Sequence, residues 1–137
     1  MNDQTQKNRI RLVLVDDHGL LRASLGRLLA SESDLEFTEE CSTFAEAVEV
    51  LRRSTVDVVV LLDLGLGTEQ GKDFVSAARQ AGYQGKFLIV VASPDVEKSA
   101  IALKLGVSGI VLRSNGPERL LQAIRLVKGG GTWVDIK

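Results

Sequence analysis

The strongest constraint on the fold is a regular alternation of two hydrophobic patterns. Short runs rich in Val, Leu and Ile lie at residues 10–15, 35–41, 56–62, 86–91 and 108–112. Between them lie longer stretches whose apolar residues are three or four positions apart, the spacing of an amphipathic helix. Strands that are apolar throughout and alternate with helices are typical of a parallel sheet covered on both faces. The alternation therefore predicts an α/β fold of five strand–helix units.

The apolar stripes of the predicted helices mark the sides that pack on this sheet. They comprise Leu21, Leu25, Leu28 and Leu29; Phe44, Ala47, Val48 and Leu51; Phe74, Val75, Ala78 and Ala81; Val96, Ala100 and Leu103; and Leu120, Leu121, Ile124 and Val127. Helix starts are indicated by Thr43, by Ser93 before Pro94 and by Gly116 before Pro117, since proline is favoured at the first helical position.

Length and composition favour one soluble domain. The chain has 137 residues, and its formal charge of −1 gives no general reason to bind nucleic acid or an anionic membrane. Its single cysteine, Cys41, cannot form an intramolecular disulfide, which fits a reducing compartment. No apolar run approaches the roughly 20 residues of a membrane span. We therefore expect a cytoplasmic protein.

The two ends differ in character from the rest of the chain. Residues 1–8 are polar and indicate a flexible tail, and the folded domain is expected over residues 9–128. Residues 129–137 begin with three glycines and indicate a flexible connector. Trp133 and Val134 are unusual in a free tail. They either pack back onto the domain or lead toward a further segment.

Two of the predicted strands end in carboxylates. Asp16 and Asp17 follow the first strand, and Asp63 follows the third. In open parallel sheets, ligands bind beyond the carboxyl ends of the strands, where the strand order reverses. With the order 2-1-3-4-5, that point lies between the first and third strands. The three carboxylates are therefore expected to converge there.

Converging carboxylates favour a bound cation. At about 4 Å and an effective dielectric constant near 20, each like-charged pair costs roughly 4 kcal/mol. Oxygen ligands without a His/Cys cluster suit Mg²⁺ better than Zn²⁺. Helix capping is the alternative, and it could account for Asp17 ahead of the first helix. It does not account for a neighbouring carboxylate and a third one across the sheet.

Four segments carry a resemblance to a known family. They are "VLVDDH", "VVVLLDLGLGTEQG", "LIVVASPD" and "SGIVLRSNGPERLLQAI". Their order and separation resemble a response-regulator receiver domain of the LuxR-type (NarL-like) subfamily, over about residues 9–130. The resemblance implies a flavodoxin-like (βα)5 doubly wound sheet of order 2-1-3-4-5. It also implies a phosphoprotein of two-component signalling and phosphorelay rather than an enzyme.

The resemblance assigns roles by position. Asp63 matches the residue that accepts a phosphoryl group from a sensor histidine kinase, giving an aspartyl phosphate. Asp16 and Asp17 match the acidic pair that holds Mg²⁺, and the backbone carbonyl of Gly65 would supply another ligand. Such domains normally regulate transcription through an attached helix-turn-helix DNA-binding domain, which residues 1–137 do not include. A homodimer is also expected, with the first and fifth helices as its candidate face.

Several positions depart from the family pattern, among them Gly67, which stands where many members have Pro. Val91 stands where the family usually has Thr or Ser, Ile110 where it has an aromatic switch residue, and Arg113 where it has Lys. Val91 offers no hydroxyl to the phosphoryl group, and we interpret Ser93 as a helix cap rather than a substitute. Two functions stay open: a phospho-accepting receiver, and a phosphorylation-independent pseudo-receiver that acts in protein binding or dimerisation. A Mg²⁺-dependent phosphohydrolase is a third, disfavoured by the lack of a general acid.

Overall fold

The structure is a computed structural model that describes residues 9–16, 19–62, 69–93 and 95–135. Its strands form one sheet in the order β2-β1-β3-β4-β5-β6, and every neighbouring pair is parallel. The strands are β1 (Ile10–Val15), β2 (Leu35–Cys41), β3 (Val58–Leu62), β4 (Lys86–Val91), β5 (Gly109–Leu112) and β6 (Trp133–Val134). The helices are α2 (Gly19–Ala30), α3 (Phe44–Arg53), α4 (Glu69–Gln80), α5 (Val96–Lys104), α6 (Pro117–Lys128) and the short 3₁₀ helix η1 (Arg113–Asn115). The flavodoxin-like fold and the order of its first five strands are confirmed.

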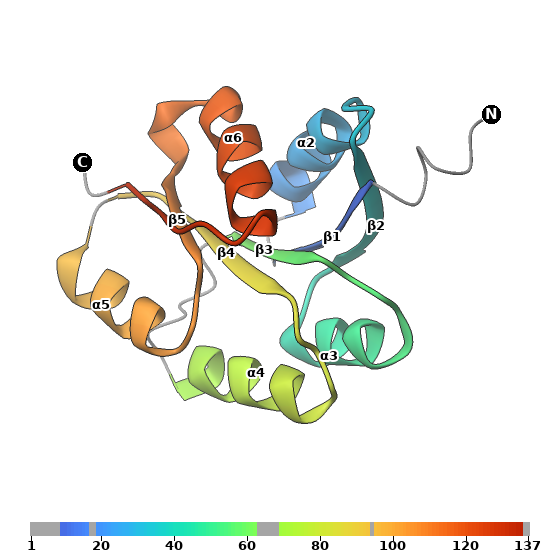
Figure 1. Ribbon diagram of the computed structural model, residues 1–137, viewed down its shortest axis with the longest axis vertical. Helices are drawn as coiled ribbons and strands as arrows, with labels where there is room; N and C mark the ends of the chain where they lie inside the picture. Colours follow the sequence, from blue (N-terminus) through green and yellow to red (C-terminus); the bar gives the residue numbers. More distant parts are fainter. Residues whose placement is uncertain (1–8, 17–18, 63–68, 94, 136–137) are drawn as a thin grey trace.

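The helices cover both faces of the sheet, with α2 and α6 on one face and α3, α4 and α5 on the other (Figure 1). Successive side chains of a strand point to opposite faces. In β1, Leu12 and Leu14 therefore join the core under α2 and α6, while Val13 and Val15 join the core under α3 and α4. This is why the strand sequences are apolar at every position instead of alternating.

Local signals set most helix ends as predicted. The Glu46 amide donates a hydrogen bond to Thr43 Oγ1 at 3.1 Å, which caps α3. Gly116 is the N-cap of α6 and Pro117 its first residue. Gly116 has φ of +91°, a conformation that glycine adopts without strain.

The sequence prediction for α5 is wrong in two respects. The helix begins at Val96 and its cap is Asp95, whose side chain accepts a hydrogen bond from the Lys98 amide at 3.0 Å. Ser93 is exposed in a bend before the helix and does not cap it, because the Asp95 carboxylate is in position to satisfy the free amide. Pro94 lies outside the described residues.

The α5 stripe predicted to face the sheet is also largely on the surface. Val96 is 72% exposed, Leu103 is 39% exposed, and Ala100 is exposed as well. Ala102 is buried instead, and Leu105 packs against the same core. The sequence of α5 contains two competing apolar stripes, and spacing alone does not decide which one meets the sheet.

The segment after α6 differs from the expected flexible connector. Trp133 and Val134 form β6, which extends the sheet beyond the five predicted strands by pairing in parallel with β5. The amides of Trp133 and Asp135 donate to Ser108 O at 3.0 Å and Ile110 O at 2.8 Å. Of the two alternatives for these residues, packing back onto the domain is confirmed. The physical reason is that Trp133 packs against the core under α2 and α6 while these backbone hydrogen bonds form.

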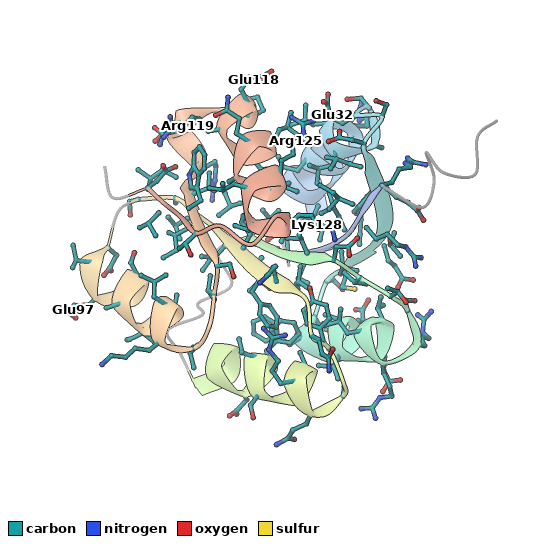
Figure 2. The ribbon with its side chains drawn as sticks, viewed as in Figure 1. Glu32, Glu97, Glu118, Arg119, Arg125 and Lys128 are labelled. Carbon is teal, nitrogen blue, oxygen red and sulfur yellow. The ribbon has the colours of Figure 1, made fainter. Side chains whose placement is uncertain are left out.

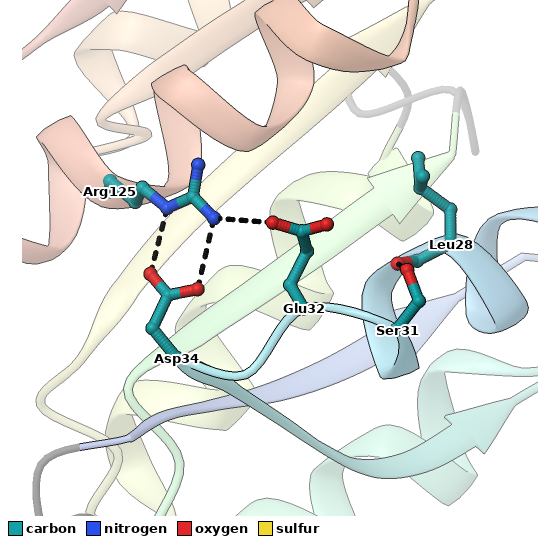
Figure 3. Close-up of polar contacts among 5 residues, drawn as sticks. All are labelled: Leu28, Ser31, Glu32, Asp34 and Arg125. Carbon is teal, nitrogen blue, oxygen red and sulfur yellow. Dashed lines mark hydrogen bonds and ion pairs between the residues drawn. The ribbon is translucent and has the colours of Figure 1, made fainter.

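Helix α6 also forms an ion pair with the segment that leads into β2, the outer strand on the other side of the sheet from β6. Arg125 donates to both carboxylate oxygens of Asp34, at 2.8 and 2.9 Å, and to Glu32 at 2.9 Å (Figure 3). The two acids belong to the connection between α2 and β2. This forked ion pair therefore links α6 to the connection that follows α2.

Candidate functional site

The carboxyl ends of four adjacent strands meet along one edge of the sheet. In the observed registers, Val15 pairs with Leu61, Leu62 with Val90, and Val91 with Leu112. Asp16 follows β1 directly, and position 63 follows the last residue of β3. The strand order thus places Asp16 next to the carboxyl end of β3, at the reversal point that the sequence indicated.

Asp16 is the one proposed metal ligand that lies within the described residues. It is fully buried, and its amide donates to Cys41 O at 3.0 Å. Burying a carboxylate is costly unless polar groups or a cation stabilise it. A carboxylate at this edge supplies the hard oxygen that Mg²⁺ prefers, so the residue present fits that ion.

The remaining proposed ligands are not tested by the structure. Asp17, Asp63 and Gly65 lie outside the described residues. Among the residues that are described, no group of three His, Cys, Asp or Glu side chains is placed to hold a metal. The roles of these three residues therefore stay predictions.

Val91 is the last residue of β4 and is half-buried. It packs against the core under α3, α4 and α5. An isopropyl side chain at this position offers the edge no hydrogen-bond donor. Ser93, two residues further on, is exposed.

Ile110 is buried, whereas Arg113 is exposed. Ile110 is only 1% exposed and belongs to the same core as Phe87 and Ala102. Arg113 follows β5 directly as the first residue of η1, and its side chain is exposed. The position predicted to correspond to the switch residue thus holds a packed aliphatic side chain, and the guanidinium three residues later is in contact with solvent.

The structure also reveals a buried carboxylate that the sequence analysis missed. Asp135, which follows β6, is 7% exposed. Its Oδ2 accepts from the Leu112 amide and from Asn115 Nδ2, both at 3.1 Å. Its Oδ1 accepts from an Arg119 guanidinium nitrogen and from Trp133 Nε1, also at 3.1 Å. The available signal was Trp133, an unusual residue for a free tail.

Burial raises the pKa of Asp135, but the hydrogen bonds from Leu112, Asn115, Arg119 and Trp133 outweigh burial and lower it overall. The carboxyl is therefore held in its ionised form by four donors. Two of these donors, Leu112 and Asn115, flank the turn that carries Arg113.

The comparisons with known proteins agree with this geometry. The sequence matches the family described as "Response regulator receiver domain" over residues 12–125. The chain belongs to this family. A receiver domain is a signalling module rather than an enzyme, which confirms the corresponding prediction.

The relatives of this receiver domain are transcriptional regulators of the NarL/LuxR type. The chain is 34% identical to the nitrate/nitrite response regulator protein NarP of Escherichia coli (strain K12), over 84% of the chain and 53% of that protein. It is 29% identical to the transcriptional regulatory protein DegU of Brevibacillus brevis, over 100% of the chain and 58% of that protein. The receiver chain thus spans a little more than half the length of these relatives.

A solved structure shows the same similarity. The chain is 29% identical to a two-component response regulator of the LuxR family from Aurantimonas sp. SI85-9A1. The TM-score is 0.81, and the match covers 91% of this chain and 89% of the other. Within the described part of this receiver domain, no helix has the length and apolar character needed to cross a membrane.

Proposed function

We propose that this receiver domain accepts a phosphoryl group on Asp63 from a sensor histidine kinase and thereby controls a transcriptional output. The observation that carries the proposal is the complete burial of Asp16. In a member of the receiver family, this residue is a fully buried carboxylate at the carboxyl end of β1, beside the strand that ends at Leu62. A buried charge in that place is difficult to explain by capping alone, since α2 begins three residues later, at Gly19.

The proposed chemistry follows from carboxylates at one edge. A carboxylate oxygen of Asp63 forms a bond to phosphorus while the bond between phosphorus and the kinase histidine nitrogen breaks. Asp16, Asp17, Asp63 and the Gly65 carbonyl would hold Mg²⁺, whose charge would offset that of the transferring oxygens. Val91 contributes no hydrogen bond to the phosphoryl group, and the exposed Arg113 supplies the cation of this edge.

The pseudo-receiver is kept as a second function because of Val91 and Ile110. Both side chains are packed against one core, and Ile110 is branched and restricted in its rotamers. Neither has the group through which receivers of the usual pattern respond to phosphate. These packed positions favour a domain that binds partners or dimerises in the same way with or without phosphate.

The output is proposed from the relatives. NarP and DegU are regulators, and the chain covers only part of their length. We place the domain in the cytoplasm, with a kinase as its upstream partner. We also propose a homodimer through α2 and α6, and DNA contact only through a separate helix-turn-helix domain.

The test is intact mass after incubation with Mg²⁺ and a small phosphodonor. Wild type is expected to gain the mass of one phosphoryl group, and a metal chelator should abolish the gain. Asp63→Asn should gain none, while Asp73→Asn, which changes an exposed acid of α4, should behave like wild type. A phosphoryl gain in Asp63→Asn would remove the acceptor role from this residue.

A further inference from the structure

The segment after α6 turns back sharply and joins the sheet beside β5, with its last described residue next to the carboxyl end of that strand. Gly130 has φ of +99°, and the Gly131 amide donates to Leu126 O at 3.0 Å. The chain then runs beside β5 as β6 and ends, within the described residues, at the buried Asp135. Residues 129–135 are here called the latch segment.

The Asp135 carboxylate joins four elements at one point. Its four donors come from the end of β5 (Leu112), from η1 (Asn115), from α6 (Arg119) and from β6 itself (Trp133). The Arg119 guanidinium also lies over the Trp133 ring, with its carbon 4.9 Å from the ring centroid. The latch segment is therefore attached to the turn through Asp135 and to α6 through Arg119, the latter near the start of that helix (Figure 2).

The turn held in this way is the one that begins with Arg113. Residues 113–115 form η1, and the bonds from Leu112 and Asn115 to Asp135 bracket it. Leu112 is also the β5 partner of Val91. Both residues lie at the carboxyl ends of the strands, the edge of the sheet where the acceptor Asp63 is expected, here called the acceptor edge. The Asp135 carboxylate thus connects the latch segment to the end of β5, and the pairing of Leu112 with Val91 continues this connection to the end of β4.

The attachment of the latch segment to the sheet is short. β6 has two residues, two backbone amides donate to β5, and Val134 remains 37% exposed. Elements with few buried apolar contacts open locally at a lower free energy than the global fold. The latch segment is therefore expected to open at a lower free energy than the five-stranded core.

We propose that the latch segment is a conformational device. When it is docked, Asp135 fixes the β5–α6 turn with Arg113 outward; when it is released, the turn is free to rearrange. We further propose that docking is linked to occupancy of the acceptor edge. This second part rests on the proposed function. Linkage is reciprocal, so a ligand at the edge must change the docking equilibrium if docking changes the edge.

The first test measures the latch itself by amide hydrogen exchange, without any phosphoryl ligand. Asp135→Asn keeps the size of the side chain but places an NH₂ group opposite N–H donors. We expect the backbone amides of Leu112, Trp133 and position 135 in this variant to exchange about tenfold faster or more than the same amides in wild type. Asn115→Ala, which removes one exposed donor and leaves the buried carboxylate in place, should accelerate the Leu112 amide to a smaller extent.

The matched control is Arg125→Gln, which breaks an ion pair on the same helix but on its other side (Figure 2). It should leave the exchange of the three amides unchanged. Equal exchange rates of the three amides in wild type, Asp135→Asn and Asn115→Ala would overturn the proposal that Asp135 holds the latch segment in place. So would an equal acceleration by Arg125→Gln, because the effect would then be a general loss of stability.

The second test measures the linkage by adding Mg²⁺ and beryllofluoride to wild type. Binding is followed separately by the ¹⁹F signal of the bound fluoride. We expect the exchange rates of the Trp133 and Asp135 amides to change about threefold or more on binding, and the apparent affinity to differ between wild type and Asp135→Asn. Bound fluoride with unchanged rates would overturn the linkage alone. Absence of bound fluoride would instead count against the proposed function and the linkage together, while the exchange data of the first test would still decide the latch.

Discussion

Replacing Val91 by Thr tests whether one missing hydroxyl limits the response of this domain. Val91 ends β4 and is half-buried against the core, and Thr has nearly the same shape and a similar preference for strands. A fully buried hydroxyl without a partner would cost about 1–3 kcal/mol. Because this position is only half-buried, water can reach the new hydroxyl, and we expect a loss of stability below about 1 kcal/mol.

The free energy that the new hydroxyl adds to phosphoryl binding at the acceptor edge is expected to be larger than this loss of stability. A hydrogen bond to a charged group contributes about 1.5–3 kcal/mol, which corresponds to binding tighter by about tenfold to 150-fold. Moving a two-state equilibrium from 1:99 to 99:1 requires about 5.5 kcal/mol. The hydroxyl would therefore supply about a quarter to a half of a full switch. Wild type, which lacks it, is expected to respond weakly.

The assay is a titration with Mg²⁺ and beryllofluoride followed by amide chemical shifts. Wild type should show small changes across residues 94–128, and Val91→Thr should bind more tightly and show larger ones. Val90→Thr is the matched control, since Val90 is buried in the core on the opposite face and its hydroxyl cannot serve the same edge. Ser93→Ala should also leave the response unchanged.

Two results would refute this reasoning. The first is a Val91→Thr affinity within about twofold of wild type, which is less than the weakest charged hydrogen bond would give. The second is a set of large shifts across residues 94–128 in wild type. That result would show that the domain switches without a hydroxyl at position 91.

Three further predictions follow from charge. Mg²⁺ should raise the melting temperature, by mass action equivalent to about 2.7 kcal/mol at a hundred times its dissociation constant; an equal rise in Asp17→Ala would remove Asp17 from the site. Residues 1–137, with a formal charge of −1, should give no sequence-selective gel shift with DNA, and a salt-dependent, selective shift would contradict this. Arg125→Gln should cost about 1 kcal/mol at low salt in chemical denaturation, because its partners are partly exposed. The hydrogen bonds from Arg125 lower the pKa of Asp34, so this stabilisation is present above the ordinary pKa of about 3.9 and is lost as the pH falls through the lower folded value. If Arg125→Gln still lowered the free energy of unfolding by the same amount at a pH below the folded pKa of Asp34, the assignment of this stabilisation to the Arg125–Asp34 ion pair would be disproved.

The central fold was predictable because its strands are apolar on both faces. Val58–Leu62 and Lys86–Val91 are short runs between polar segments, and a sheet covered on both sides buries all of the first run and the central four residues of the second. The α5 stripe was not predictable in the same way. Leu103 and Ala102 are both apolar and adjacent, and the packing of the whole layer decides which of them is buried.

The candidate site was predictable in part for a related reason. Asp16 follows an apolar run, and strand order alone brings it to the edge where Asp63 is expected. Asp135 could not be found by the same logic. A two-residue strand has no period to detect, and three of the four donors to the Asp135 carboxylate come from positions 16 to 23 residues earlier in the chain.

The two-residue strand β6 also determines which side of the sheet can associate with other strands. The outer strand on the far side, β2, carries Glu36, Glu39 and Glu40, and such charges discourage strand pairing between molecules. β5 has the sequence GIVL, with no charge to protect it, and β6 occupies its outer hydrogen-bonding positions at Ser108 and Ile110. A fragment that ends at Lys128 would uncover an apolar edge and is expected to aggregate. A fragment that keeps residues through Asp135 should stay monodisperse at the same concentration.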